Sequence, residues 1–584
     1  MGTEEISSQT RANHRYFIRI DKAEPRRFRA VVSLAMSHNL IELLKRRGGG
    51  PAATLDVLRR ALEERGEVTD DDRRAAAAAS GLPEATVYGI STFYDDLLRP
   101  VGRRDVRVCT GTACWAAAFD GQIRDLEQGL GLRLGTRSED GELSLTETVC
   151  LGFCHSSPSF REGDVVDAGP GALERILSGE TAPAPEPEWE STLPEPVLTR
   201  PGDYSGLRRA LAELTPEQLL EEVKAANLRG RGGAGFPAGL KWEFARKAAG
   251  PSKVIVANGD EGDPGSYIDK YLMERNPALL LEGMALAGYA VGAETGYVYV
   301  RSEYPRSKPA LDAALAAAYE AGELGDDIAG SGFSFHVHVV VGAGSYVVGE
   351  ETALLNSLQG LRGTVNSRPP FPAERGYHEL PTVVNNVETL CNVPFIALRG
   401  AEAFAALSPG ATPGSKLVCL NERFERPGIW EVPLGTSLRE ICEGLGGGMR
   451  DGRSLKALQI GGPLGGILPA WELDTPFDFE PLAEKGCMLG HGGIVAFDDR
   501  TNARELARHL LRFGAHESCG KCFPCRIGMT RALELVSAEE PVDRAKLEEL
   551  LETLEVASLC AHGSGMPAPI RSLIAHFPEE LGLR

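Results

Sequence analysis

The sequence predicts a multidomain protein of the α/β class. Its 584 residues are enough for about three to five domains of ordinary size. Between residues 253 and 341, strand-like apolar segments alternate with helix-like segments, which is typical of an α/β fold. A segment rich in proline and glutamate, from Gly179 to Pro201, reads as an extended linker that divides the chain into two modules.

The composition argues against several classes of protein. The formal net charge of -20 and the pI near 5.2 disfavour a nucleic-acid partner, since phosphate binding needs a basic surface. No apolar run approaches the roughly 20 residues of a membrane span, and the N-terminus lacks the apolar core of a secretory signal. We therefore expect a cytoplasmic protein with no direct membrane span, which can be a peripheral part of a larger assembly.

The first hundred residues offer little chemistry. Residues 1–50 are charged and poorly patterned, and we assign them no function. From Ala53 to Leu98, apolar residues at helical spacing indicate a small helical bundle. We expect this bundle to serve packing only.

Two pairs of cysteines follow strand-like segments between residues 104 and 179. The four residues are Cys109, Cys114, Cys150 and Cys154. A C-x4-C pair and a C-x3-C pair at one end of a sheet would supply four thiolates for a [2Fe-2S] cluster. The spacing alone also permits zinc, and a disulfide pair is a third alternative that a reducing compartment disfavours.

A glycine-rich segment at residues 228–242 is the most distinctive part of the chain. Its glycines let the backbone approach a ligand and free consecutive N–H groups for an anion, and Arg231 and Lys241 add positive charge. Residues 230–235 match the dinucleotide pattern G-x-G-x-x-G, but a helix-like segment precedes them and Pro237 stops a helix from continuing directly out of the loop. We therefore predict a phosphate-binding loop between helices, with a plain glycine-rich linker as the alternative.

Polar residues end several of the predicted strands. The strand at residues 253–258 leads into Asn258, Asp260, Glu261 and Asp263. Such a strand end is where an α/β sheet usually binds ligands, although an acidic turn that caps the next helix would explain one or two of these residues. Farther along, a glycine turn at residues 342–349 is followed by two carboxylates, at residues 350–351. The paired amides at residues 385–386 suit a heterocycle edge or a ribitol chain.

The last third of the chain predicts two further domains. Short strands and turns from about residue 414 to 468 indicate a small α+β domain that acts as a spacer or docking surface. In the tail, a C-x2-C-x2-C run matches three ligands of a [4Fe-4S] cluster, and the only later cysteine must supply the fourth, with zinc as the alternative. These residues are Cys519, Cys522, Cys525 and Cys560. The scattered Cys391, Cys419, Cys442 and Cys487 are expected to be core thiols.

A nicotinamide gives up two electrons as a hydride, whereas an iron-sulfur cluster accepts one electron at a time, and a flavin can do both. A phosphate-anchored flavin site, a second nucleotide pocket and thiolate clusters on one chain therefore predict a protein that splits a hydride into single electrons. The motifs GRGGAGFPAGLKW, NGDEGDPG, GAGSYVVGEETAL, RPPFPA, NNVET, ESCGKCFPCRIG and the late SLC resemble those of the flavin-bearing, NADH-oxidising subunit of respiratory complex I. The motifs CTGTAC, CLGFC and VYGISTFY resemble its thioredoxin-like [2Fe-2S] partner subunit. Their fusion in one chain resembles the diaphorase subunits of NAD-dependent formate dehydrogenases and NAD-reducing hydrogenases.

The resemblance implies a domain order. We expect an N-terminal extension at 1–50, a helical bundle at 51–103, a thioredoxin-like [2Fe-2S] domain at 104–179, a linker at 180–201, a Rossmann-like FMN/NADH domain at 202–410, a ubiquitin-like (β-grasp) domain at 411–475 and a C-terminal helical [4Fe-4S] domain at 476–584.

Site residues also follow from the resemblance. FMN would be held by Gly230, Arg231, Gly232, Gly233, Gly235, Lys241, Asn258, Asp260, Glu261, Tyr346, Gly349, Glu350, Asn385, Asn386 and Thr389. Phe236, Asp263, Glu351, Arg368 and Phe371 would face NADH, with Asp263 and Glu351 as candidate catalytic residues. Three positions differ from the complex I members that the chain resembles. Asp263 stands where those members usually have glutamate, Arg368 where many have lysine, and Val348 where a cysteine is common. The first two differences bear on the choice between NADH and NADPH.

The implied function is that of an NADH:acceptor oxidoreductase subunit. Hydride would pass between NAD(H) and FMN, and single electrons would pass through the clusters to other electron-transfer subunits of a redox complex. Diaphorase subunits of hydrogenases often lack part of the [2Fe-2S] ligand set, so the presence of all four cysteines in this chain favours the formate dehydrogenase type. The alternatives are the NADH-input subunit of complex I or of a hydrogenase, and a non-catalytic iron-sulfur redox sensor. The chain has no molybdopterin or nickel-iron motif, so the terminal reaction belongs to another polypeptide.

Overall fold

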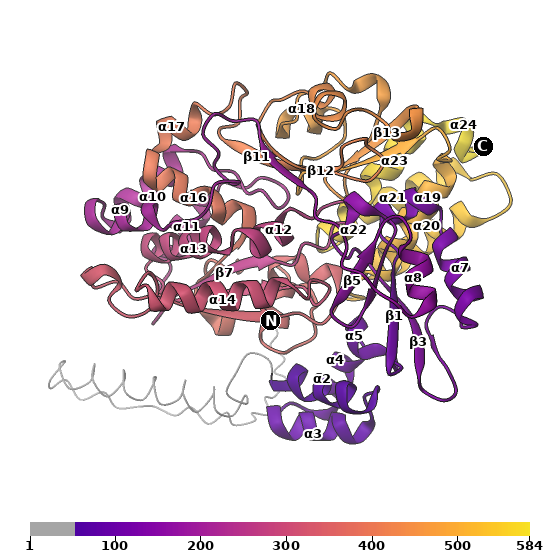
Figure 1. Cartoon of the computed structure of the whole chain (residues 1–584), viewed down its shortest axis with the longest axis horizontal. Helices are drawn as coiled ribbons and strands as arrows, with labels where there is room; N and C mark the ends of the chain where they lie inside the picture. The colour runs from indigo at the N-terminus through magenta and orange to yellow at the C-terminus, as the bar shows by residue number, and fades with distance from the viewer. Residues whose placement is uncertain (1–52) are drawn as a thin grey trace, which may run out of the picture. The chain divides into compact units, whose positions relative to one another are not determined.

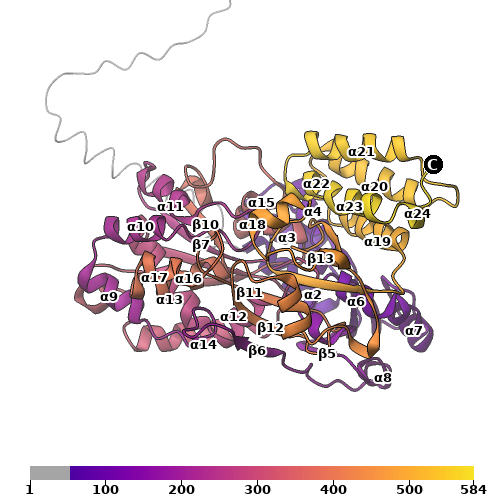
Figure 2. The same ribbon diagram turned by 90° about the horizontal axis from the view of Figure 1, so that it is seen from above.

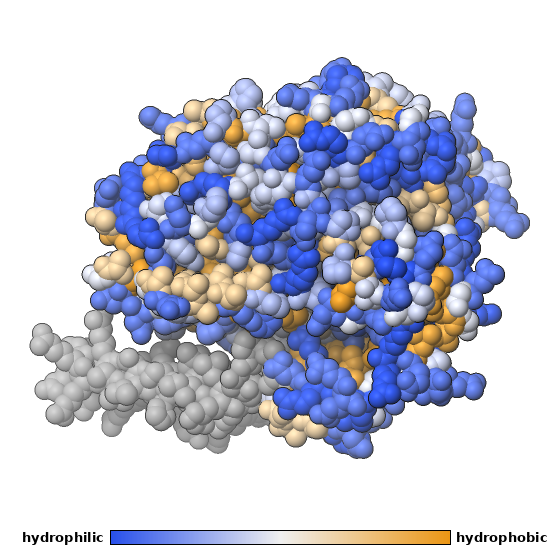
Figure 3. Space-filling view, viewed as in Figure 1, coloured by the Kyte–Doolittle hydropathy of each residue, from blue (hydrophilic) through white to orange (hydrophobic). Residues whose placement is uncertain are grey.

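A computed structural model describes residues 53–584 of the chain (Figure 1). The extension expected at residues 1–50 lies outside the described residues. Among residues 53–584, no helix combines the length and the apolar character needed to cross a bilayer. The face of these residues seen in Figure 3 is mainly hydrophilic, with apolar side chains in small patches.

The first described residues form the expected helical bundle. Its helices are α2 (Ala53–Arg65), α3 (Asp70–Ser80), α4 (Glu84–Ser91) and α5 (Asp95–Leu98). Thr69 begins α3 with a reciprocal cap, because its side chain accepts the Asp72 N–H while the Asp72 carboxylate accepts the Thr69 N–H. Leu58 and Ile90 of the bundle share a buried core with Val256 of the following sheet domain, so the bundle covers that sheet as packing.

The next domain is a five-stranded sheet with three helices. Its elements are β1 (Arg104–Cys109), α6 (Thr112–Ala118), α7 (Gly121–Leu130), β2 (Thr136–Arg137), β3 (Leu143–Thr148), β4 (Ser159–Glu162), β5 (Val165–Ala168) and α8 (Ala172–Ser178). The strand order is β2-β3-β1-β4-β5, and β1 and β3 are parallel. Because parallel strands end at the same edge, both cysteine-bearing loops leave the sheet together.

The segment expected to be a linker contributes a strand of its own. Residues Glu188–Ser191 form β6, which pairs in parallel with β12 (Gly428–Pro433). The carboxylate of Glu431 accepts the N–H groups of Val197, Leu198 and Thr199, so the segment after β6 is anchored to the sheet. The linker is extended as predicted, and its extension is used for pairing.

The central domain is a parallel sheet of four strands, in the order β10-β7-β8-β9, with helices around it (Figures 1 and 2). The strands are β7 (Val254–Gly259), β8 (Thr295–Val300), β9 (His336–Val341) and β10 (Thr382–Asn386). The helices are α9 (Ser205–Glu213), α10 (Pro216–Ala225), α11 (Ala238–Lys247), α12 (Ile268–Arg275), α13 (Pro277–Val291), α14 (Ser307–Glu320), α15 (Glu351–Leu358), α16 (Val387–Arg399) and α17 (Ala401–Ala405). In the register of β10 and β7, Asn386 lies beside Asn258, so the polar strand ends meet at one edge.

The six-stranded sheet of the next domain continues past the expected boundary at residue 475. Its strands are β6, β11 (Ser415–Leu420), β12, β13 (Leu455–Ile460), β14 (Ile467–Pro469) and β15 (Gly493–Asp498), and α18 (Phe479–Glu484) lies between β14 and β15 in sequence. Because β15 pairs with both β11 and β13, it belongs in the middle of this sheet. A boundary after Asp498 keeps the sheet whole, whereas local composition does not reveal strand pairing.

The tail is a group of helices (Figure 2). They are α19 (Ala503–His516), α20 (Phe523–Ser537), α21 (Arg544–Ala557), α22 (Ala561–Gly565), α23 (Pro567–His576) and α24 (Pro578–Leu581). Leu510, Met529, Leu551 and Ile570 are fully buried between them. This packing brings the start of α20 close to the start of α22. Cys519 and Cys522 precede α20, Cys525 lies in its first turn, and Cys560 precedes α22.

Candidate functional site

An open cleft of about 870 Å³ lies at the edge of the parallel sheet where its strands end. Its walls come from the glycine segment, α11, the ends of β7 and β10, and the start of α15. This is the position at which parallel α/β sheets bind ligands, because the loops there are free to diverge.

The glycine segment forms a loop between two helices, as predicted. It follows α10, and the Gly230 N–H donates to the Phe236 carbonyl over 3.0 Å to close it. Pro237 is the cap of α11, so the proline begins the next helix. A side chain at Gly232 would come within 2.7 Å of Asn386, whereas Gly233 has no atom within 4 Å of the place where a Cβ would lie. The side of Gly233 on which a Cβ would project is therefore open to a ligand, while its backbone forms a β-bridge with Gly490.

Most of the predicted cofactor residues line this cleft. They are Gly230, Gly232, Gly233, Gly235, Phe236, Lys241, Asn258, Gly349, Glu350, Glu351, Arg368, Phe371, Asn385, Asn386 and Thr389. These residues come from five separate stretches of sequence, and the fold brings them to one place.

Charged side chains form a small network in the cleft. The Lys241 Nζ donates to Glu351 Oε2 over 3.1 Å and to the Val384 carbonyl over 2.9 Å. Arg368 donates to Glu351 Oε1 over 2.9 Å, so Glu351 lies between two cations. The Glu350 Oε2 accepts the N–H groups that begin α15, whereas its Oε1 is buried without a hydrogen-bond partner.

Five predicted residues do not line the cleft: Arg231, Asp260, Glu261, Asp263 and Tyr346. Arg231 is fully buried, its Nη2 donates to the Pro413 carbonyl over 3.1 Å while its Nε and Nη1 have no hydrogen-bond partner, and burial lowers its pKa to about 10. Glu261 is fully buried and accepts the Ile268 and Lys270 N–H groups, so for this residue the helix-capping alternative describes the contacts. Burial raises the pKa of Asp260, whose Oδ2 lacks a partner.

Asp263 belongs to a hydrogen-bonded chain behind the cleft. It accepts a hydrogen bond from the Tyr346 hydroxyl over 2.7 Å, and its other oxygen lies 2.7 Å from the His491 Nδ1. Although burial opposes the charge, the bond to Asp263 and the nearby charges of Asp263, Asp269 and Glu261 raise the pKa of His491 to about 9. Asp269 in turn accepts from the amide of the cleft residue Asn386. The chain thus connects Tyr346 to the cleft through ionisable groups.

Sequence reasoning missed two kinds of residue here. His491 comes from the domain to which no chemistry was assigned, and its only signal was a lone histidine between glycines. Phe244 lines the cleft and is 53% exposed, as is Phe236. Leu240 and Phe244 lie four residues apart on α11, and both are exposed. Apolar residues at this spacing form one face of a helix, and this pattern was the signal in the sequence for a binding surface.

The first four predicted metal ligands converge at the edge of the five-stranded sheet. The Cys150 and Cys154 Sγ atoms lie 3.6 Å apart. Contact with Cys150, burial and the nearby thiols of Cys114 and Cys109 raise the pKa of Cys154, so the two pairs face one another. The Cys114 Sγ also lies 3.5 Å from two serine hydroxyls. Four buried sulfur donors fit a [2Fe-2S] cluster.

The tail thiols also gather at one place. Burial raises the pKa of Cys525 to about 12, and the nearby thiols of Cys522, Cys560 and Cys519 add to the effect, so these three lie near Cys525. Cys519 likewise contributes to the raised pKa of Cys560. Ala561, the residue after Cys560, lines the cleft. The remaining thiols, Cys391, Cys419, Cys442 and Cys487, are buried, and burial raises the pKa of each, as expected of core cysteines.

Comparison with known proteins gives matches along most of the chain. The Nuo51 FMN-binding domain matches residues 223–395, the thioredoxin-like [2Fe-2S] ferredoxin family residues 40–169, and the iron-sulfur binding region of NADH-ubiquinone oxidoreductase-F residues 505–584. An F-type subunit of the NADH-quinone oxidoreductase of Rhizobium meliloti is 46% identical over 65% of this chain and 91% of its own length. The HndC subunit of the NADP-reducing hydrogenase of Solidesulfovibrio fructosivorans is 43% identical over 65% of this chain and 78% of its own. A crystal structure of an NAD+-reducing [NiFe]-hydrogenase in the H2-reduced state aligns with 92% of this chain and 93% of its own, with a TM-score of 0.82 and 30% identity.

Proposed function

The chain belongs to the family of F-type subunits of NADH-quinone oxidoreductases, and from this premise we propose that it is the NADH-input subunit of an NAD-dependent formate dehydrogenase or a related complex. The matches confirm the expected resemblance, the α/β multidomain fold and the cofactors FMN, NAD(H), [2Fe-2S] and [4Fe-4S]. The chain is an NADH-oxidising flavin and iron-sulfur subunit of the complex I or NAD-reducing hydrogenase type, and its relatives are subunits of larger complexes.

The fused architecture supports the choice of complex. The F-type relative from Rhizobium meliloti and the hydrogenase subunit HndC each align with 65% of this chain, whereas the chain of the NAD+-reducing hydrogenase structure aligns with 92% of it. A diaphorase subunit of a hydrogenase or a formate dehydrogenase therefore accounts for more of the molecule than a complex I subunit does. All four [2Fe-2S] cysteines are present, which favours the formate dehydrogenase type over the hydrogenase type. Metal analysis of the native complex decides: molybdenum or tungsten supports this choice, and nickel or neither metal overturns it.

The inner part of the cleft suits FMN. When bound, FMN accepts a hydride from a nicotinamide and gives up electrons singly. We assign the open side of Gly233 and the Lys241 ammonium to the phosphate, and the amides of Asn258 and Asn385 to the ring and the ribityl chain. Glu350 Oε1 is a buried polar atom that faces Arg368 at 3.6 Å but accepts no hydrogen bond, and a ligand hydroxyl or N–H would satisfy it.

The outer part of the cleft suits a dinucleotide. Phe236, Phe244 and Phe371 line it and are 53%, 53% and 51% exposed, so their rings are free to stack on planar heterocycles. Glu351 and Arg368 are placed to orient the nicotinamide end, and no side chain is required as a general base for hydride transfer. Asp263 does not line the cleft, so we assign it a positioning role through His491 and Asp269, which accepts a hydrogen bond from the cleft residue Asn386.

One observation carries the proposal: the residue that follows the cluster ligand Cys560 is itself a wall of the flavin cleft. The site that accepts a hydride and the site that passes on single electrons are therefore neighbours. Protein purified under anaerobic conditions should show a flavin absorbance band that NADH bleaches, together with NADH-ferricyanide activity. A colourless protein after reconstitution would overturn the proposal, and bleaching without turnover would favour a redox sensor.

A further inference from the structure

We propose that Arg301, a residue of the flavin-binding domain, positions the [2Fe-2S] ligand Cys150 and connects it to the loop that follows the cleft residue Asn258. The inference rests on the proposed assignment of Cys109, Cys114, Cys150 and Cys154 to the [2Fe-2S] cluster. It gives a role to a residue that no sequence motif singled out.

Arg301 follows β8 and is only 4% exposed. Its Nη1 donates to the Glu261 carbonyl over 2.5 Å, and its Nη2 donates to the Val149 carbonyl over 2.8 Å and to Glu303 Oε1 over 2.7 Å. Val149 directly precedes Cys150, whereas Glu261 belongs to the loop that follows Asn258 at the cleft. One guanidinium therefore holds two backbone carbonyls from different domains.

The contact with Val149 matters because of the backbone of Cys150. Cys150 has φ +59°, in the left-handed region that residues with a Cβ seldom adopt. Such a conformation persists only where neighbouring groups hold it. Arg301 binds the carbonyl of the peptide that joins Val149 to Cys150, so it restrains the rotation that sets this φ. The Cys150 Sγ itself contacts the Ser266 carbonyl, at 3.8 Å.

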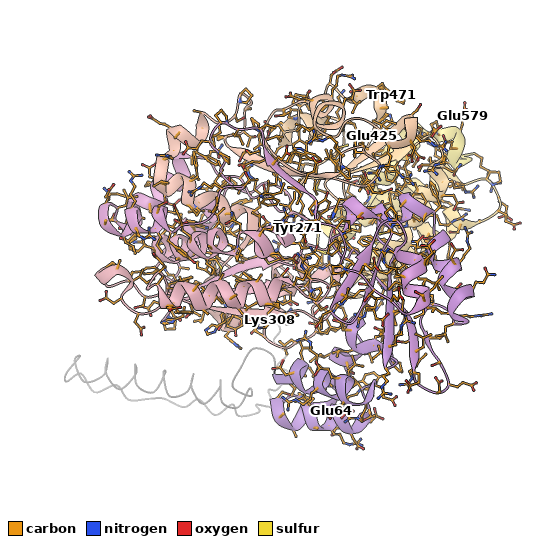
Figure 4. The ribbon with its side chains drawn as sticks, viewed as in Figure 1. Glu64, Tyr271, Lys308, Glu425, Trp471 and Glu579 are labelled. Atoms are coloured by element: carbon orange, nitrogen blue, oxygen red, sulfur yellow. The ribbon has the colours of Figure 1, made fainter. Side chains whose placement is uncertain are left out.

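The surrounding packing makes the ligand loop depend on the flavin domain. A Cβ at Gly152 would lie 2.5 Å from Lys270 and 2.8 Å from Tyr304, so this loop closes tightly on α12 and on the residues after β8. Tyr271 of α12, labelled in Figure 4, lies at this junction, with its ring centroid 6.1 Å from that of His155. The Tyr304 hydroxyl also donates to the Glu261 carbonyl, over 3.0 Å.

The positive charge of Arg301 also acts on the cluster ligand that its hydrogen bonds position. A guanidinium keeps its proton throughout the physiological pH range, so Arg301 is a buried cation, and Glu303 is its ion-pair partner at 2.7 Å. A buried cation beside a cluster stabilises the reduced, more negative state and raises the reduction potential. Glu303 offsets part of this effect, and the rest acts on Cys150.

The test compares Arg301→Met with Arg161→Met. Arg161 crosses the same junction by donating to the Ser302 carbonyl over 2.6 Å, and its other hydrogen bond goes to the Gly163 carbonyl and not to either loop, so it is the matched control. EPR spectra and redox titrations of the anaerobic full-length protein measure the [2Fe-2S] signal and its midpoint potential. FMN content and the [4Fe-4S] signal report on the rest of the fold.

We expect Arg301→Met to lower the [2Fe-2S] midpoint potential and to change its EPR line shape, or to lose this cluster alone. Arg301→Lys, which keeps the charge but not the two-carbonyl contact, should recover the potential better than the line shape. An unchanged signal and potential in Arg301→Met would overturn the inference. If Arg301→Met does not fold, Arg301→Lys decides, since a wild-type line shape there contradicts the positioning role.

Failure of the underlying assignment gives a different result. If wild-type protein has no [2Fe-2S] signal, or if Cys150→Ser leaves that signal unchanged, the ligand assignment is wrong. A wild-type signal that Cys150→Ser alters but Arg301→Met does not contradicts only the role of Arg301.

Discussion

Replacement of Lys241 by methionine should weaken FMN binding by about 10- to 150-fold. A charge-assisted hydrogen bond contributes about 1.5–3 kcal/mol, and each 1.4 kcal/mol corresponds to a factor of about ten in affinity. Lys241 lines the cleft, where its ammonium contacts Glu351 and the Val384 carbonyl. Arg368 still pairs with Glu351 in the variant, so the loss should reflect the missing ligand contact and not an unpaired carboxylate.

Titration of the deflavinated protein with FMN, followed by quenching of flavin fluorescence, measures this affinity. Lys247→Met is the matched control, because Lys247 also lines the cleft but its side chain is 72% exposed and pairs with Glu243. An exposed ion pair contributes about 0–1 kcal/mol, so this control should change the affinity by about fivefold at most. If Lys247→Met lost FMN while Lys241→Met retained it, the phosphate would lie at the other end of the cleft and our placement would be wrong.

The remaining predictions concern the cluster, a buried ion pair and pH. Cys522→Ser should remove the [4Fe-4S] EPR signal and block electron transfer to a partner while NADH still bleaches the flavin; loss of bleaching as well would contradict separate sites. Lys416 and Glu388 form a fully buried ion pair, so Lys416→Met should cost about 3–5 kcal/mol in denaturant unfolding, and adding Glu388→Gln should recover most of it. His491 has a folded pKa of about 9, above its unfolded value near 6.5, so its stabilisation is complete below pH 6.5 and is lost as the pH rises through 9. The thermal unfolding midpoint should fall more steeply over this range in wild type than in His491→Gln, and parallel profiles would refute the effect.

Much of this architecture was predictable from local patterns. Apolar periodicity and turn residues predicted the parallel strands and the helices between them, because these signals depend on neighbours in sequence. The glycine loop was placed correctly between helices, since a helix-like segment precedes it and a proline follows it. Strand pairing was not predictable in this way: β15 joins a sheet whose other strands end before residue 470, and β6 pairs with a strand that lies more than two hundred residues later.

By itself the sequence determined the chemistry available to this protein, because glycine, cysteine and carboxylate spacings are local and their reactivity is intrinsic. Only the tertiary structure decided which side chains meet. It buried Arg231 against the Pro413 carbonyl, outside the cleft lining, and placed His491 against Asp263, 228 residues away in sequence. It also laid Arg301 across the loops of two domains. Such contacts depend on the direction of each side chain and on packing between distant segments, and the spacing of residues along the chain determines neither.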